Sequence, residues 1–169
     1  HQGYGVADVR VSRVLGSKFL KRWERAAREH DISGSLTRQI RSLVAEDRFV
    51  ETSYGHGDLV GTNIMMLPER GFVLIDWEYA GRLPVLFDVA KLHLHSPDSN
   101  RALAALERGL RTSLRHGTAD YSVREQLALA HVRYLAWEAR RRQRAQTANR
   151  LDQLRRITDL RLRAVRGLG

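Results

Sequence analysis

The sequence contains no cysteine, which excludes a disulfide framework, a thiol nucleophile and a thiolate metal site. Any chemistry must therefore use oxygen and nitrogen groups. The chain also lacks a run of about 20 apolar residues that would span a bilayer, and its first residues lack the basic-then-apolar pattern of a signal peptide. We therefore expect neither membrane insertion nor secretion, and a reducing cytoplasm as the location.

Lysine is scarce, and acidic residues are scarce in the last third of the chain. Only Lys18, Lys21 and Lys91 are lysine among 29 basic residues. Residues 1–100 carry 13 basic and 13 acidic side chains, whereas residues 101–169 carry 16 and 6, so the whole net charge of +10 lies in the last third. Such a pattern is typical of solvated arginine faces on helices, and less often of a surface for an anion, an acidic partner or nucleic acid.

The length of 169 residues allows one domain with its own core, and 43% hydrophobic with 28% charged residues is typical of a soluble globular protein. Apolar residues recur at three- and four-residue spacing over most of the chain, which predicts a mostly α-helical α+β fold. We predict helices from Ser17 to before Asp31, from Ser35 through Val44, at about Phe87–His93, from the cap Ser96 to Gly117, from the cap Ser122 past Trp137 into Arg140–Arg144, and at about Ala148–Arg166.

β-structure is expected only in the middle of the chain. The segment Phe49–Tyr54 is β-prone and precedes a glycine, so it reads as a strand that leads into a loop. Asn63–Leu67 and Phe72–Ile75 flank Pro68–Gly71, which predicts a β-hairpin with a four-residue connection. This hairpin is the only clear sheet element. Among the large apolar side chains, we expect Trp23 and Trp137 in the core and Met65 and Met66 in strand packing.

Two polar clusters stand at the two ends of this hairpin. His56–Asp58 with Asn63 precede it, and Ile75–Glu78 end it. Because the strands are antiparallel and the turn is short, we expect Asp58, Asn63 and Asp76 to line one small polar cavity. An aspartate that accepts a hydroxyl proton, beside an asparagine and a second aspartate that hold magnesium on nucleotide phosphates, suits phosphoryl transfer.

These residues resemble the aminoglycoside phosphotransferase and choline kinase family. Its catalytic loop, His-Gly-Asp-x-x-x-x-Asn, is matched by His56-Gly57-Asp58-Leu-Val-Gly-Thr-Asn63, and its metal-binding motif by Ile75-Asp76-Trp77-Glu78. The continuations Tyr79-Ala80-Gly81 and Phe87-Asp88-Val89-Ala90 are similar too. The resemblance is sharp over residues 54–92. It implies the carboxy-terminal lobe of a protein kinase-like fold, with ATP or GTP as phosphoryl donor and Mg²⁺ as cofactor.

The resemblance also implies a role for each matched residue. Asp58 would be the base that accepts the proton, and His56 would shape the loop with Gly57. Asn63 and Asp76 would bind the metal and thereby the nucleotide, with Glu78 in support. We expect His56 to hold a backbone carbonyl, and Asp88 to support the loop structurally.

The chain is expected to be one lobe with three segments: a helical segment at 1–48, the catalytic and metal loops at 49–92, and a basic helical subdomain at 93–169. A kinase of this family also needs an amino-terminal nucleotide lobe with a glycine-rich loop and a strand lysine. Gly3-Tyr-Gly5 is only a fragment of such a loop, and Lys18 and Lys21 fall in a predicted helix. We therefore expect this lobe to be absent from the sequence given, supplied by a partner chain, or lost.

The acceptor is expected to be a small hydroxylated molecule, neutral or anionic rather than polycationic. A cationic compound would be repelled by the charge of +10 over residues 101–169, unless Glu78, Glu107 or Glu138 provided a local acidic pocket.

One alternative remains open, namely a noncatalytic pseudokinase-like or basic helical module for an acidic partner or nucleic acid. Its basic surface would comprise Arg140–Arg144, Arg155, Arg156, Arg161 and Arg163. Such binding would weaken steeply with salt. No aromatic residues interleave with these arginines, so we do not expect a nucleic-acid partner.

Overall fold

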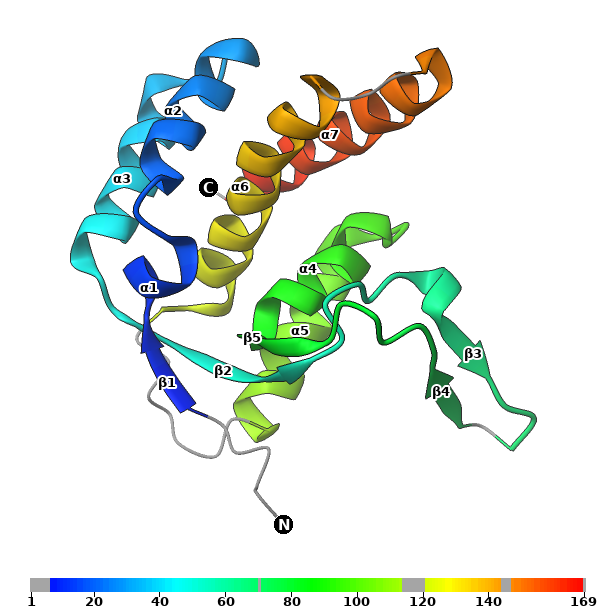
Figure 1. Ribbon diagram of the computed structural model, residues 1–169. Coiled ribbons are helices and arrows are strands. Elements are labelled where there is room, and N and C mark those ends of the chain that lie inside the picture. Colours follow the sequence, from blue (N-terminus) through cyan, green and yellow to red (C-terminus); the bar gives the residue numbers. More distant parts are fainter. Residues whose placement is uncertain (1–6, 70, 114–120, 144–146, 169) are drawn as a thin grey trace.

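The computed structural model describes residues 7–69, 71–113, 121–143 and 147–168 (Figure 1). The described chain is mostly helical, with two small antiparallel sheets. In chain order the elements are β1 (Ala7–Arg10), α1 (Val11–Leu15), α2 (Phe19–Glu29), α3 (Gly34–Glu46), β2 (Phe49–Gly55), the 3-10 turn η1 (Gly61–Asn63), β3 (Ile64–Met66), β4 (Phe72–Leu74), β5 (Gly81–Pro84), α4 (Val85–His95), α5 (Ser99–Ser113), α6 (Val123–Gln143) and α7 (Ala148–Leu168).

The first sheet has three strands in the order β1-β2-β5, which corrects the expectation that the hairpin is the only sheet element. β2 lies in the middle, with Ala7 of β1 opposite Thr52 and Gly81 of β5 opposite Gly55. β1 and β5 have four residues each. The sequence of β1, Ala-Asp-Val-Arg, alternates apolar and polar residues, but four residues are too few to predict a strand, and β5 shows no such alternation. The strand geometry of both depends on pairing with β2.

The second sheet is the predicted hairpin of β3 and β4, which is confirmed, with Ile64 opposite Leu74 and Met66 opposite Phe72. It projects from the body of the molecule, as Figure 1 shows. Met65 and Met66 are 52% and 71% exposed, so the expectation that they pack within the fold is wrong. A two-stranded hairpin buries few side chains by itself.

Helix α6 runs through the middle of the fold and contacts α2, α4 and α7 (Figure 1). The core lies around it and includes Trp23 of α2, which is fully buried as expected. Trp137 was expected in the core as well but is 50% exposed, because it lies on a different face of α6 from the buried Leu135. None of the described helices combines the length and the apolar character needed to cross a membrane.

The helix caps confirm one prediction and correct another. At the start of α6, Glu125 Oε2 accepts from the Ser122 amide at 2.7 Å and Ser122 Oγ accepts from the Glu125 amide at 3.2 Å, which is the predicted capping box. Ser96 does not begin α5, because it ends α4 in an extended conformation. Asp98 caps α5 instead by accepting from the Arg101 amide at 2.9 Å. The expected helix end at Gly117 lies outside the described residues.

A buried histidine of α6 predicts how stability depends on pH. His131 is fully buried, with Nε2 3.1 Å from His93 Nδ1 and Nδ1 3.4 Å from Arg161 Nη1. Burial, followed by the charges of Arg161 and His93, lowers its pKa well below 6.5. Below pH 6.5 the unfolded chain therefore takes up a proton that the folded chain does not. We expect stability to fall with pH below 6.5, by up to about 1.4 kcal/mol per pH unit.

Urea unfolding between pH 5 and pH 7.5 checks this expectation. His131→Gln should flatten the dependence of the unfolding free energy on pH. His95→Gln should leave it unchanged, because His95 is exposed. An equally steep loss of stability in wild type and in His131→Gln would contradict this assignment.

Candidate active site

The two polar segments lie where the two sheets join. β2 ends at Gly55, and its pairing with Gly81 places the segment that starts at His56 beside the segment that leads into β5. The pairing of Ile64 with Leu74 closes the same two segments from the other side. Residues 56–63 and 75–80 are thereby held together between two strand pairs, one of which the sequence did not predict.

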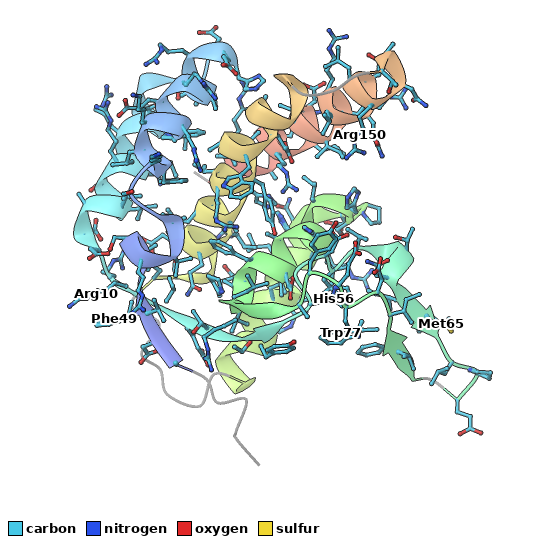
Figure 2. All side chains as sticks on the ribbon, in the orientation of Figure 1. Arg10, Phe49, His56, Met65, Trp77 and Arg150 are labelled. Carbon is cyan, nitrogen blue, oxygen red and sulfur yellow. The ribbon has the colours of Figure 1, made fainter. Side chains whose placement is uncertain are left out.

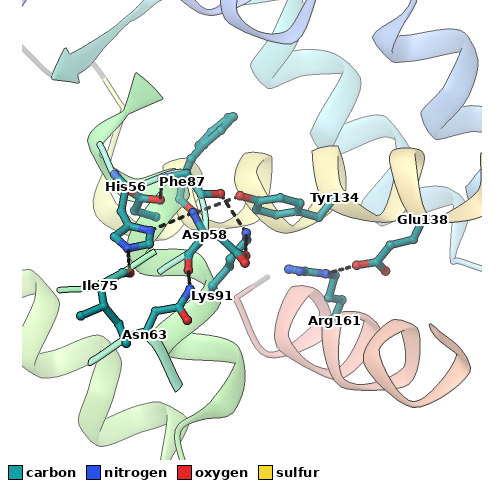
Figure 3. Close-up of polar contacts among 11 residues, drawn as sticks. His56, Asp58, Asn63, Ile75, Phe87, Lys91, Tyr134, Glu138 and Arg161 are labelled. Atoms are coloured by element: carbon teal, nitrogen blue, oxygen red, sulfur yellow. Dashed lines mark hydrogen bonds and ion pairs between the residues drawn. The ribbon is translucent and has the colours of Figure 1, made fainter. Parts of the chain in front are cut away.

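His56 links these two segments. It is only 2% exposed, and its Nε2 donates to the carbonyl oxygen of Ile75 at 2.7 Å (Figure 3). Its Nδ1 accepts from the Asp58 amide at 3.3 Å, so both ring nitrogens are used, as in a neutral imidazole protonated at Nε2. The ring centres of His56 and Trp77 lie 4.8 Å apart. Figure 2 labels both side chains. His56 thus holds a backbone carbonyl and orients the loop.

Asp88, in the first turn of α4, holds the backbone of the same loop. Its Oδ2 accepts from the His56 amide at 2.5 Å and its Oδ1 from the Gly57 amide at 2.8 Å. The side chain is buried, so these charge-assisted bonds compensate for the loss of water around the carboxylate.

The tight turn at Gly57 requires glycine. Its φ is 79°, and a Cβ there would lie 2.1 Å from the carbonyl oxygen of Tyr79. A side chain would therefore push apart the two segments that His56 holds together.

Asn63 is the last residue of the first segment and Asp76 is the second residue of the other, and the two differ in exposure. Asn63 is 8% exposed. Its side-chain Nδ2 donates to the backbone carbonyl of Asp58 at 3.0 Å, and its backbone carbonyl accepts from the Ile75 amide at 3.0 Å. Asp76 follows with a φ of 65°, a left-handed conformation that a non-glycine residue adopts at an energetic cost. Its side chain is exposed. Glu78 is exposed as well, and no contact in the described chain joins it to Asp58 or Asn63.

Lys91 is a site residue that the sequence analysis missed. Its Nζ forms an ion pair with Asp58 Oδ1 and donates to the Gly57 carbonyl at 2.9 Å. The signal was present, because Lys91 follows Asp88 by three residues and a spacing of three places both on one face of α4. The one lysine outside the amino-terminal region therefore lies beside the candidate base.

Asp58 lies at the edge of a cavity of about 430 Å³ that extends toward α6 and α7. Of Asp58, Asn63 and Asp76, which we expect to line one small polar cavity, only Asp58 is among the residues that line this space. Asn63 instead turns its amide into the loop. The cavity is lined by residues of the two loop segments, β5, α4, α6 and α7. Its apolar and aromatic lining includes Tyr79, Leu83, Phe87, Leu94, Tyr134, Trp137, Leu154 and Ile157.

Glu78, Glu107 and Glu138 do not give this cavity a net negative charge. Glu138 lines the cavity, but its Oε1 accepts from Arg161 Nε at 2.6 Å, and both side chains are nearly buried (Figure 3). Glu107 pairs with Arg124 at 3.2 Å and, like Glu78, is not among the cavity residues.

Arg161 is buried and so cannot belong to the basic surface expected for a noncatalytic binding module. Arg161 is 4% exposed and bound to Glu138, so its assignment to a surface for an acidic partner is wrong. Arg155 is exposed but pairs with Asp152 at 3.2 Å. Arg144 lies outside the described residues.

The comparison with known families agrees with this loop geometry. Residues 5–127 match the phosphotransferase enzyme family. The chain belongs to this family. The match includes both polar segments and Lys91, and it ends in α6.

One solved structure resembles the fold of this chain at low sequence identity. The crystal structure of choline kinase LicA from Streptococcus pneumoniae matches with a TM-score of 0.50 and 23% identity over 89% of this chain. The matched part is 53% of that protein, so the chain spans about half the length of this relative. At this identity the match supports the family fold alone. No curated protein matches the chain.

Proposed function

We propose that this chain carries the acceptor side and the catalytic loop of an ATP- or GTP-dependent O-phosphotransferase, within one kinase-like carboxy-terminal lobe. The observation that supports this most directly is the ordered loop at Asp58. His56, Asp88 and Asn63 all hydrogen-bond within or across that loop, while the carboxylate of Asp58 faces a cavity large enough for a small molecule.

In the proposed reaction, Asp58 accepts the proton of an acceptor hydroxyl held in the cavity. The hydroxyl oxygen forms a bond to the γ-phosphorus, the bond from that phosphorus to the β–γ bridging oxygen breaks, and the nucleoside diphosphate leaves with the electron pair. Lys91 holds one carboxylate oxygen of Asp58. The loop bonds from Asp88 and His56 fix its backbone, so little reorganisation is needed when the acceptor binds.

The oxygen groups at the hairpin fit a magnesium ion shared with a nucleotide. Within the described residues, no group of three His, Cys, Asp or Glu side chains could hold a metal ion alone. Magnesium is usually held by one or two carboxylates together with substrate phosphates. Asp76 is exposed and follows Ile75, whose amide binds the backbone carbonyl of Asn63, so Asp76 could hold such an ion with Asn63, with Glu78 in support. When bound, the ion would neutralise charge on the phosphates.

A phosphoryl-transfer assay on the natural protein in its full length tests the proposal. With ATP or GTP, Mg²⁺ and a panel of hydroxylated small molecules, we expect release of nucleoside diphosphate that depends on the acceptor. EDTA should abolish it and excess Mg²⁺ should restore it. A protein that neither binds nucleotide nor releases diphosphate with any acceptor would contradict the proposed function and favour a noncatalytic module.

A further inference from the structure

The charges around the cavity do not balance. Its lining includes four cationic side chains, Lys91, Arg133, Arg150 and Arg161, but only two carboxylates, Asp58 and Glu138. Lys91 pairs with Asp58, and Arg161 pairs with Glu138. The two remaining arginines form no ion pair with any acidic residue in the described ranges.

Arg133 lies in the wall that α6 contributes. Its guanidinium carbon stands 5.1 Å from the ring centre of Phe87 and 5.6 Å from that of Trp137, so aromatic faces rather than carboxylates surround it. Its Nε is buried and has no hydrogen-bond partner in the described chain. Burial lowers its pKa, so the protein bears a cost for this cation. A cation held in this way at a cavity wall is suited to a bound anion.

Arg150 stands at the edge of the cavity, in the first turn of α7 (Figure 2). It is exposed, and Nη1 donates to Gln153 Oε1 at 2.6 Å, which leaves its charge uncompensated. Arg133 on α6 and Arg150 on α7 therefore contribute positive charge from two helices. Both line the same space as Asp58, which belongs to the loop between β2 and η1.

We propose that the cavity takes a small hydroxylated anion, with its carboxylate or phosphate group bound by Arg133 and Arg150 and its hydroxyl directed at Asp58. The inference rests on the proposed function, since Asp58 defines where the hydroxyl must lie. Guanidinium groups bind both carboxylate and phosphate through paired hydrogen bonds. The two arginines therefore favour an anionic compound of either kind and do not distinguish a carboxylate from a phosphate. Hydroxylated amines are excluded by the same charge.

The test uses the natural full-length protein and four matched acceptor series of three to six carbons. These are hydroxy acids, sugar phosphates, uncharged polyols and hydroxylated amines, each assayed for diphosphate release with ATP or GTP. We expect the lowest KM values in one of the two anionic series, and the comparison of hydroxy acids with sugar phosphates identifies the anion. Preferential turnover of polyols or amines would overturn this inference and leave the proposed function intact.

Two variants and one control test whether Arg133 and Arg150 cause the preference for anionic acceptors. Arg133→Gln and Arg150→Gln should each raise KM for the preferred anion by about tenfold or more, the loss expected for a charged hydrogen bond, with little change in kcat. Their KM values for polyols should stay constant. Arg108→Gln removes an exposed arginine of α5 outside the cavity and should change neither parameter.

Arg150 is exposed, so its variant keeps the test decisive if Arg133→Gln fails to fold. Unchanged KM values for anions in Arg150→Gln and in any folded Arg133 variant would overturn the inference. Absence of nucleotide binding and of diphosphate release in every series would instead remove the proposed function and this inference with it.

Discussion

Asp58→Ala is expected to lower the rate of phosphoryl transfer by roughly 10²–10⁴-fold, the usual contribution of a positioned general base. The side chain lies beside the cavity and accepts from Lys91, so its removal takes away the group that receives the hydroxyl proton. The assay follows kcat and KM in the natural full-length protein. We expect the loss mainly in kcat, because the groups proposed to bind the acceptor anion are elsewhere.

The same substitution should barely affect folding. The Asp58 side chain is 36% exposed and that of Lys91 is 14% exposed. Lys91 keeps its hydrogen bond to the Gly57 carbonyl in the variant, so we expect a loss of about 1 kcal/mol. Asp159→Ala is the matched control, because Asp159 is an exposed aspartate of α7 away from the loop. It should leave both turnover and stability unchanged. Full turnover by Asp58→Ala would show that another group accepts the proton.

The largest effect on stability is expected from breaking the ion pair of Glu138 with Arg161. These side chains are 6% and 5% exposed, and Arg161 Nε donates to Glu138 Oε1 at 2.6 Å. Glu138→Leu would leave a buried guanidinium without its carboxylate, which typically costs about 3–5 kcal/mol. Urea unfolding at pH 7 measures this loss.

A double variant and an exposed pair complete this experiment. Glu138→Leu with Arg161→Met removes both charges and should recover most of the lost stability, since apolar replacement of a buried pair is often neutral. The exposed pair of Glu107 with Arg124 supplies the control, and Glu107→Leu should cost less than about 1 kcal/mol. If Glu138→Leu cost no more than Glu107→Leu, the pair would not stabilise the fold.

The sequence predicted the elements whose causes are local. Apolar periodicity located α2 and α4, and the spacing of Ser122 and Glu125 located the start of α6. The hairpin followed from its turn residues and strand propensity. β1 and β5 were not predicted, because a segment of four residues is too short to give a clear local signal and becomes a strand through pairing with β2.

In the candidate site, too, the contacts within one loop could be predicted from the sequence, whereas those that depend on helix packing could not. The spacing of His56, Asp58 and Asn63 predicted one loop, and hydrogen bonds within that loop hold all three. The spacing of Lys91 and Asp88 places both on one face of α4, but the ion pair of Lys91 with Asp58 depends on how α4 packs against the loop. The contact of Arg133 with the ring of Phe87 depends on how α6 packs against α4. A pattern of residues along the chain does not determine such packing.

Asp88 and Lys91 stand one turn apart on α4 and bind the loop by amides on one side and a carbonyl and a carboxylate on the other. A displacement of α4 along its axis would therefore carry the turn at Gly57 with it. Asp58 and the α4 residues that line the cavity would then keep their relative positions. A bound hydroxyl compound that pushed on α4 would therefore move the helix and Asp58 together.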